Sequence, residues 1–110
     1  MASGIVRGDI RVYQFAAPDK RRPVLILTRN SSILHLASVT VAPVTSTIRG
    51  VESEVVLNED DGMKSPCAVN LHNLISIPQA ALSKRVAQLN SSRMSEVCSA
   101  LRFSLGCDFS

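Results

Sequence analysis

The chain of 110 residues is too short to bury a second core, and its balance of 45% hydrophobic to 19% charged residues excludes a disordered chain, so we predict a single domain over residues 1–110. The formal net charge of +3 favours an anionic partner, and nucleic acid and an acidic protein segment both fit that sign. No apolar run approaches the roughly 20 residues that cross a bilayer, and the N-terminus lacks a secretory stretch, so we expect a cytoplasmic protein with no membrane partner.

The first half of the chain is typical of short strands separated by turns. The predicted strands cover residues 8–15, 23–28, 36–42 and 54–57. The first alternates its two faces with period two, whereas the second and third are apolar or β-branched throughout, which indicates strands buried on both sides. Polar residues at 18–20 and 30–32 predict the turns that separate these three strands.

The second half continues this pattern and then changes period. Residues 58–62 predict a turn, residues 68–77 one or two strands, residues 79–82 a single helical turn after Pro78, and residues 83–89 a further strand. The apolar side chains that follow have helical spacing: Met94, Val97, Cys98, Leu101 and Leu105.

This spacing predicts a helix of about 14 residues, capped by Ser91 or Ser92 and ended by Gly106. Because no strand–helix–strand alternation precedes it, we expect a β-rich α+β fold. In this fold, a small, strongly curved antiparallel sheet of five to seven strands has one C-terminal helix packed on it.

Several common catalytic and metal-binding patterns are missing from the sequence. It contains no GxGxxG, GxxxxGK[ST], GxSxG or HExxH motif, and its three cysteines have no CxxC spacing, which argues against a disulfide framework or a zinc site. The acidic residues at 59–61 fit a solvated turn better than a metal cage, and His35 and His72 are more often structural than catalytic in such a context. We therefore predict neither a metal nor another cofactor.

Two polar segments carry the chemistry that the sequence does offer. Lys20, Arg21 and Arg22 precede Pro23, which fixes the backbone beside Arg22, so this run is either a solvated basic turn or a rigidly held phosphate ligand. The segment PVTSTIRG at 43–50 sets three hydroxyls and a second guanidinium after a strand, and either a capped loop or an anion site fits it.

Read in order, five blocks of the sequence resemble the MazF/PemK family of toxin ribonucleases. The blocks are RGDI (7–10), RPVL (22–25), VAPVT (41–45), EVVL (54–57) and CAVN (67–70). The resemblance implies a barrel of the plasmid-maintenance-toxin type, related to the Src-homology 3 barrel, and a homodimer. It also implies a toxin that cuts single-stranded RNA at short sequences without a metal and is neutralised by a cognate antitoxin, which the charge argument predicts to be acidic.

The resemblance also implies where the reaction takes place. Its catalytic arginine and threonine match Arg22 and Thr45. The further candidates for substrate contacts are Arg21, Ser46, Thr47, Arg49 and Asp19. Asp19 is the only carboxylate that the loop before Arg22 offers as a proton acceptor.

Two other functions would use the same barrel. A gyrase poison of the CcdB type would bind a protein without cutting RNA, and a barrel that has lost activity would only bind RNA or an antitoxin. The presence of both Arg22 and Thr45 favours the nuclease over either alternative.

Overall fold

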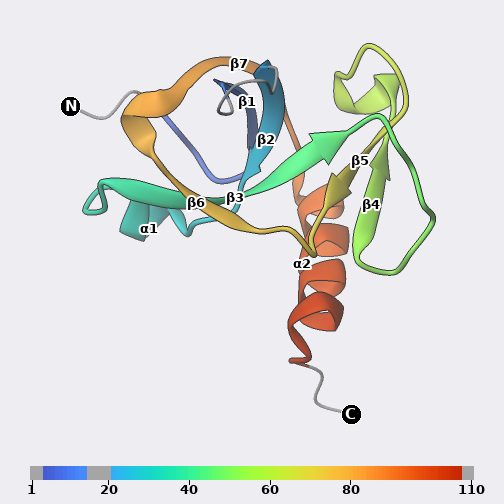
Figure 1. Ribbon diagram of the computed structural model, residues 1–110. Helices are drawn as coiled ribbons and strands as arrows, with labels where there is room; N and C mark the ends of the chain where they lie inside the picture. Colours follow the sequence, from blue (N-terminus) through green and yellow to red (C-terminus); the bar gives the residue numbers. More distant parts are fainter. Residues whose placement is uncertain (1–3, 15–20, 108–110) are drawn as a thin grey trace.

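A computed structural model describes residues 4–14 and 21–107, which form a curved antiparallel sheet followed by one long helix (Figure 1). The strands are β1 (Asp9–Gln14), β2 (Arg21–Ile26), β3 (Ser38–Thr45), β4 (Glu54–Leu57), β5 (Cys67–Asn70), β6 (Ile75–Pro78) and β7 (Leu82–Gln88). The helical segments are α1 (Asn30–Ile33), the 3₁₀ turns η1 (Glu59–Asp61) and η2 (Gln79–Ala81), and α2 (Ser91–Leu105). The predicted β-rich α+β class is confirmed.

β3 is the strand around which the sheet is organised. The hydrogen-bonded order is β4-β5-β3-β2-β1-β7, with β6 also paired to β3. Figure 1 shows β1, β2, β3, β6 and β7 curling around a common interior, while β4 and β5 stand beside α2. No pairing joins β6 to β7 in the described residues, so the sheet curls as a barrel does without closing.

β3 changes its partners after Pro43. Up to that residue β3 pairs with β2 and β6, and beyond it Val44 and Thr45 pair with Val69 and Ala68 of β5. Proline has no backbone N–H to donate to a neighbouring strand, so a change of partner disturbs few hydrogen bonds there. Thr45 therefore lies where the two parts of the sheet meet.

β2 is buried on both sides, as its apolar sequence predicts. Leu25 belongs to a core cluster that also holds Val97 and Ala100 of α2, whereas Val24 and Ile26 belong to a second cluster. Because full burial of one such side chain stabilises the fold by about 1.5–3 kcal/mol, this strand is a firm support for the exposed arginines at its beginning.

The part of the sheet formed by the end of β3, β5 and β4 has two different faces. Val44 and Val69 are a cross-strand pair buried in the cluster beneath α2. Since successive side chains of a strand point to opposite faces, Thr45, Asn70 and Glu54 lie on the face away from this cluster. Polar side chains from three strands thus share one accessible surface.

The ends of α2 agree only in part with the sequence prediction. The prediction that Ser91 or Ser92 caps the helix is wrong, because Asn90 is the cap and its side-chain oxygen accepts a 2.9 Å hydrogen bond from the Arg93 N–H. Both serines lie in the first turn instead. Gly106 ends the helix as predicted, with a φ of 70° that glycine adopts without strain.

The predicted apolar stripe of α2 is buried only in its middle. Val97 is fully buried, whereas Leu105 is 58% exposed because the last turn extends past β4 (Figure 1). Met94, Cys98 and Leu101 are half-buried between these extremes. None of the helices in the described ranges combines the length and the apolar composition that a membrane crossing requires.

Two other segments differ from their predictions. The predicted polar turn at 30–32 is the short helix α1, which buries Ile33 in the second core cluster. The predicted strand at 36–42 begins only at Ser38 and extends to Thr45, because the pairing with β5 lengthens it. Residues 68–77 form two strands, and the predicted helical turn after Pro78 is η2.

Candidate active site

Arg22 and Thr45 lie at the same place in the fold, where β2 begins and β3 ends, and both line the same two cavities. The last pair between these strands is Val24 with Pro43, and each of the two residues lies two positions beyond it. Arg22 is exposed at the beginning of β2, and among the described residues no carboxylate forms an ion pair with it. Its guanidinium is therefore available to an external anion.

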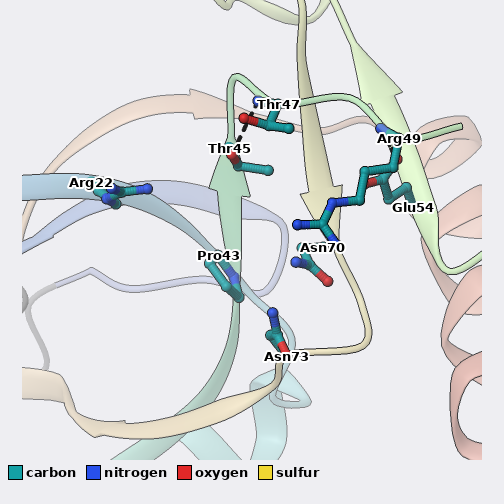
Figure 2. Close-up of a pocket in the computed structure, with 8 residues that line it drawn as sticks. All are labelled: Arg22, Pro43, Thr45, Thr47, Arg49, Glu54, Asn70 and Asn73. Atoms are coloured by element: carbon teal, nitrogen blue, oxygen red, sulfur yellow. Dashed lines mark hydrogen bonds between the residues drawn. The ribbon is translucent and has the colours of Figure 1, made fainter. Parts of the chain in front are cut away.

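The Thr45 hydroxyl is oriented by the turn that follows β3. Its Oγ1 accepts a hydrogen bond from the Thr47 backbone N–H at 3.1 Å, which is drawn as a dashed line in Figure 2. A hydroxyl that accepts through one lone pair keeps its hydrogen for another partner. Half-buried at the end of its strand, Thr45 is thus arranged as a hydrogen-bond donor beside Arg22.

A polar cavity of about 380 Å³ lies on one side of this pair. It is lined by Arg22, Pro43, Thr45, Thr47, Arg49, Glu54, Asn70 and Asn73. Figure 2 shows Arg49 reaching from the loop after β3 across the cavity toward Asn70. Glu54 and Asn70 are cross-strand partners on β4 and β5, so two paired strands hold them in place. We call this space the polar cavity.

A larger and strongly basic cavity of about 740 Å³ lies on the other side. It is lined by Arg21, Arg22, Pro23, Val44, Thr45, Ser46, Met63, Lys64, Ser65, Cys67, Lys84, Arg85 and Val86. Five of these residues are cationic and none is acidic, although Arg85 lies 3.7 Å from the buried carboxylate of Asp9. We call this space the basic cavity, and its charge favours an anionic polymer.

The two cavities divide the predicted site residues between them. Arg22 and Thr45 line both, so the pair stands at their junction. Two further groups line one cavity each, with Thr47 and Arg49 on the polar side and Arg21 and Ser46 on the basic side. Asp19 lies outside the described residues.

Sequence reasoning missed several residues of the two cavities. Glu54 and Asn70 stand at the ends of short strands, and a polar residue at the edge of an apolar block was the available signal for them. Lys64 and Lys84 lie in segments far from Arg22 along the chain, and only the folding of β7 and of the loop after η1 brings them to the basic cavity.

The Cys67 thiol and the Ser53–His72 pair do not provide a nucleophile or a base at the junction. Burial raises the pKa of the Cys67 thiol, which disfavours a thiolate nucleophile. His72 Nδ1 lies 2.6 Å from Ser53 Oγ, and neither residue lines the two cavities. In the described part of the chain no group of three or more His, Cys, Asp or Glu residues is arranged to hold a metal ion.

The junction therefore supplies positive charge and a neutral donor. A guanidinium can bind two phosphate oxygens at once, and a hydroxyl beside it can donate to the same group. Such a pair stabilises negative charge that develops on a phosphodiester, with room for the neighbouring parts of a strand in the cavities on either side.

Residues 6–105 match a family model described as the PemK-like, MazF-like toxin of type II toxin-antitoxin systems. Over 102 residues the chain is 38% identical to a protein of Mycobacterium tuberculosis named probable endoribonuclease MazF2. The matched region covers 92% of this chain and 98% of that relative.

Solved structures share the fold. The Mycobacterium tuberculosis toxin MazF-mt6 superposes with a TM-score of 0.83 at 36% identity, covering 92% of this chain and 99% of that one. An endoribonuclease from a mycobacterial species, solved in complex with its cognate antitoxin, superposes with a TM-score of 0.83 at 23% identity. That match covers 97% of this chain and 100% of the other, and it shows the common fold.

Proposed function

This chain belongs to the PemK-like, MazF-like family of toxins of type II toxin-antitoxin systems and is an endoribonuclease, and we propose that it cuts single-stranded RNA at selected sequences without a metal ion. The observation that carries the proposal is that Arg22 and Thr45 together line both the polar and the basic cavity, at the junction of the two. RNA as the substrate agrees with the predicted cytoplasmic location.

RNA carries its own nucleophile. The 2′-hydroxyl attacks the adjacent phosphorus, so that a bond from O2′ to phosphorus forms while the bond from phosphorus to O5′ breaks. The 2′-hydroxyl loses a proton and O5′ gains one, leaving a cyclic 2′,3′-phosphate and a free 5′-hydroxyl. This reaction needs charge stabilisation and proton transfer, but neither a metal nor a protein nucleophile.

Arg22 and Thr45 have complementary roles in this proposal. Arg22 stabilises the charge that grows on the phosphoryl oxygens and helps to protonate the leaving oxygen, while the Thr45 hydroxyl donates to the same phosphate. A guanidinium that stays protonated at neutral pH is a poor proton acceptor, so another group must accept the 2′ proton. Asp19 stays the predicted carboxylate for that step.

The neighbouring candidates hold the strand on either side of the cut. Thr47 and Arg49 contact the part of the RNA that enters the polar cavity, and Arg21 and Ser46 contact the part that follows the basic cavity. Phosphate contacts position the strand, whereas sequence is read at base edges that single-stranded RNA leaves exposed. Selectivity is therefore expected from the polar cavity more than from the basic one.

We also propose that the active form is a homodimer and that a cognate antitoxin with an acidic segment silences it. The mycobacterial endoribonuclease with this fold was solved in complex with its antitoxin. Lys64 and Lys84 of the basic cavity supply the opposite charge, and the 40% exposed side chain of Val86 offers an apolar anchor beside them. An acidic segment there would occupy the surface that RNA needs.

One experiment tests the reaction directly. Purified protein is incubated with a long single-stranded RNA in excess chelator, and the ends of the fragments are mapped and their chemistry determined. We expect cuts at few sequences, each leaving a cyclic phosphate and a 5′-hydroxyl, and no cut where the scissile nucleotide is 2′-deoxyribose. A magnesium requirement would overturn the proposed mechanism, and intact RNA under all conditions would favour the gyrase-poison alternative.

A further inference from the structure

Glu54 is held in the polar cavity with one carboxylate oxygen occupied and the other open. Its Oε1 accepts hydrogen bonds from the backbone N–H groups of Arg49 and Gly50, both at 3.0 Å. Within the part of the chain that the structure describes, no donor reaches Oε2. Two bonds to the loop and the strand pairing of β4 thus fix an acceptor beside the junction.

Asn70 supplies the matching donor on the neighbouring strand. Its Oδ1 accepts a hydrogen bond from the His72 backbone N–H at 3.1 Å, which leaves the Nδ2 group to donate. Glu54 and Asn70 are direct cross-strand partners, and such pairs have Cβ atoms only about 4.5–5.5 Å apart. One wall of the cavity therefore offers an acceptor next to a donor, which is the arrangement that reads the edge of a planar base.

We propose that the polar cavity binds the base of a nucleotide beside the scissile phosphate, and that Glu54 and Asn70 select a base whose Watson–Crick edge carries an amino group next to an unprotonated ring nitrogen. Cytosine and adenine share this edge. The inference rests on the proposed cleavage of RNA at Arg22 and Thr45, and it assigns the selectivity of that reaction to two residues outside the pair.

The hydrogen-bond pattern separates these bases from the other two. The amino group of cytosine or adenine donates to Glu54 Oε2, and the adjacent ring nitrogen accepts from Asn70 Nδ2. Guanine offers two parallel N–H groups that require both carboxylate oxygens, but Oε1 is already filled by the loop. Uracil also has a donor next to an acceptor, N3–H beside O4, but the second carbonyl oxygen on the other side of N3 then repels the carboxylate.

Charge supports the same assignment. A carboxylate repels the RNA backbone, and this repulsion at an RNA site is offset where the carboxylate also accepts a hydrogen bond from the bound strand. Among the residues that the structure describes, Glu54 is the one acidic residue that lines the polar cavity. The Arg49 guanidinium faces the same space and offsets the charge of Glu54 toward phosphates (Figure 2). A base that cannot donate to the carboxylate therefore gains no hydrogen bond there and is also repelled by its charge.

Glu54→Gln is the sharpest test, because glutamine keeps Oε1 for the two backbone N–H groups and replaces the open acceptor with a donor. Wild-type and variant protein are given RNA with randomised positions, and the cut ends are sequenced. The wild type should enrich cytosine or adenine at one fixed position beside the cut. In the variant this enrichment should fall by about tenfold to a hundredfold, with a shift toward uracil or guanine.

Glu52→Gln is the matched control. It removes the same charge two residues away, from a side chain that does not line the polar cavity, and it should keep the wild-type preference. Thermal unfolding of both variants monitors the fold. If RNA is cut and the Glu54→Gln preference equals that of the wild type, the inference is overturned while the proposed function stands.

A second arm changes the substrate instead of the protein. The selected base is replaced by its analogue without the amino group, which also tells cytosine from adenine. The analogue should lower the cleavage rate of the wild type by the same factor by which Glu54→Gln lowers the cleavage rate on natural RNA. It should lower the rate of the variant little further, because both changes remove the same contact. An analogue cut by the wild type at the full rate would refute the inference, even if the variant failed to fold. Wild-type protein that cuts no RNA would instead refute the proposed function.

Discussion

The backbone N–H of Thr47 donates to Thr45 Oγ1 over 3.1 Å, so the turn that ends β3 also orients the hydroxyl that shares two cavities with Arg22. The hydroxyl thus has two tasks, since it accepts from the loop and donates to an external group. Serine retains both, and valine retains neither at nearly the same volume.

We predict that Thr45→Val lowers the single-turnover cleavage rate by about tenfold, whereas Thr45→Ser retains most of the activity. One neutral hydrogen bond contributes about 1 ± 0.5 kcal/mol, and a loss of 1.4 kcal/mol is about a factor of ten. The rates are measured on one RNA oligonucleotide at saturating protein. Full activity in Thr45→Val together with a loss in Thr45→Ser would show that the methyl group, and not the hydroxyl, matters.

Arg22→Ala should lower the cleavage rate by about two to three orders of magnitude, the scale for removing one donor that stabilises developing charge. The variant should fold normally because Arg22 is exposed and has no ion-pair partner among the described residues. Arg21→Ala is the control, since Arg21 lines only the basic cavity and should mainly weaken binding. Near-normal cutting by Arg22→Ala would contradict the assignment of Arg22 as the residue that stabilises the developing charge.

Lys64→Gln and Lys84→Gln should each reduce RNA affinity and make it less sensitive to salt. Every phosphate contact on a single strand adds about 0.7 to the slope of log affinity against log salt, so each variant should lose about one contact's share. Binding of an uncleavable 2′-deoxy RNA is titrated from low to high salt. Arg102→Gln, on α2 and away from both cavities, should keep the wild-type slope.

Asp61 should make folding stability depend on acidity. The hydrogen bonds from the Arg93 guanidinium, at 2.9 and 3.0 Å, hold the pKa of Asp61 below its ordinary value of 3.8. Because the folded pKa is the lower one, the stabilisation is fully present above pH 3.8 and is lost as the pH falls through the folded value. The pair joins η1 to α2, and the loop after η1 carries Lys64 to the basic cavity.

The corresponding variant is Asp61→Asn. At pH 7 it should lower the free energy of unfolding by about 1–3 kcal/mol, and the difference from the wild type should shrink below pH 3.8. Urea unfolding at several pH values measures both. Asp60→Asn, at the exposed neighbouring position, should show no such dependence. A difference that stays constant down to pH 2 would contradict the assigned origin of the stability.

Short-range residue patterns in the sequence predict those features of the fold that neighbouring residues determine. The unbroken apolar run of β2 indicates burial on two sides, and Gly106 marks the end of α2. Prediction fails where tertiary packing decides. Burial of Ile33 turns a polar segment into the helix α1, and of three adjacent polar residues able to cap α2 it is Asn90, not Ser91, that does so.

The site shows the same division. Arg22 and Thr45 stand out as candidates because they lie within sequence blocks that resemble a known family, and the structure brings both to the same two cavities. Glu54 and Asn70 also lie within such blocks, but there they look like the ends of ordinary strands. Only the pairing of β4 with β5, and of β5 with β3, brings them to the cavity beside Thr45, and no local pattern contains that information.

The last prediction concerns control by the antitoxin. An acidic segment that occupies the basic cavity should compete with RNA, because both would need the positive field of Arg21, Lys64 and Lys84. Raising salt should weaken RNA binding steeply through counterion release, whereas a segment that also buries apolar side chains against Val86 should lose less affinity.

The measurement is a competition assay across salt, with a peptide from the cognate antitoxin displacing a labelled 2′-deoxy RNA. Light scattering of the same samples reports the assembly, which we expect to be a homodimer. The peptide concentration that displaces half of the RNA should rise linearly with RNA concentration, and Val86→Ser should weaken binding of the peptide more than binding of the RNA. A monodisperse active monomer would refute the dimer. An antitoxin-bound protein that still cuts RNA at the full rate would refute occlusion of the site.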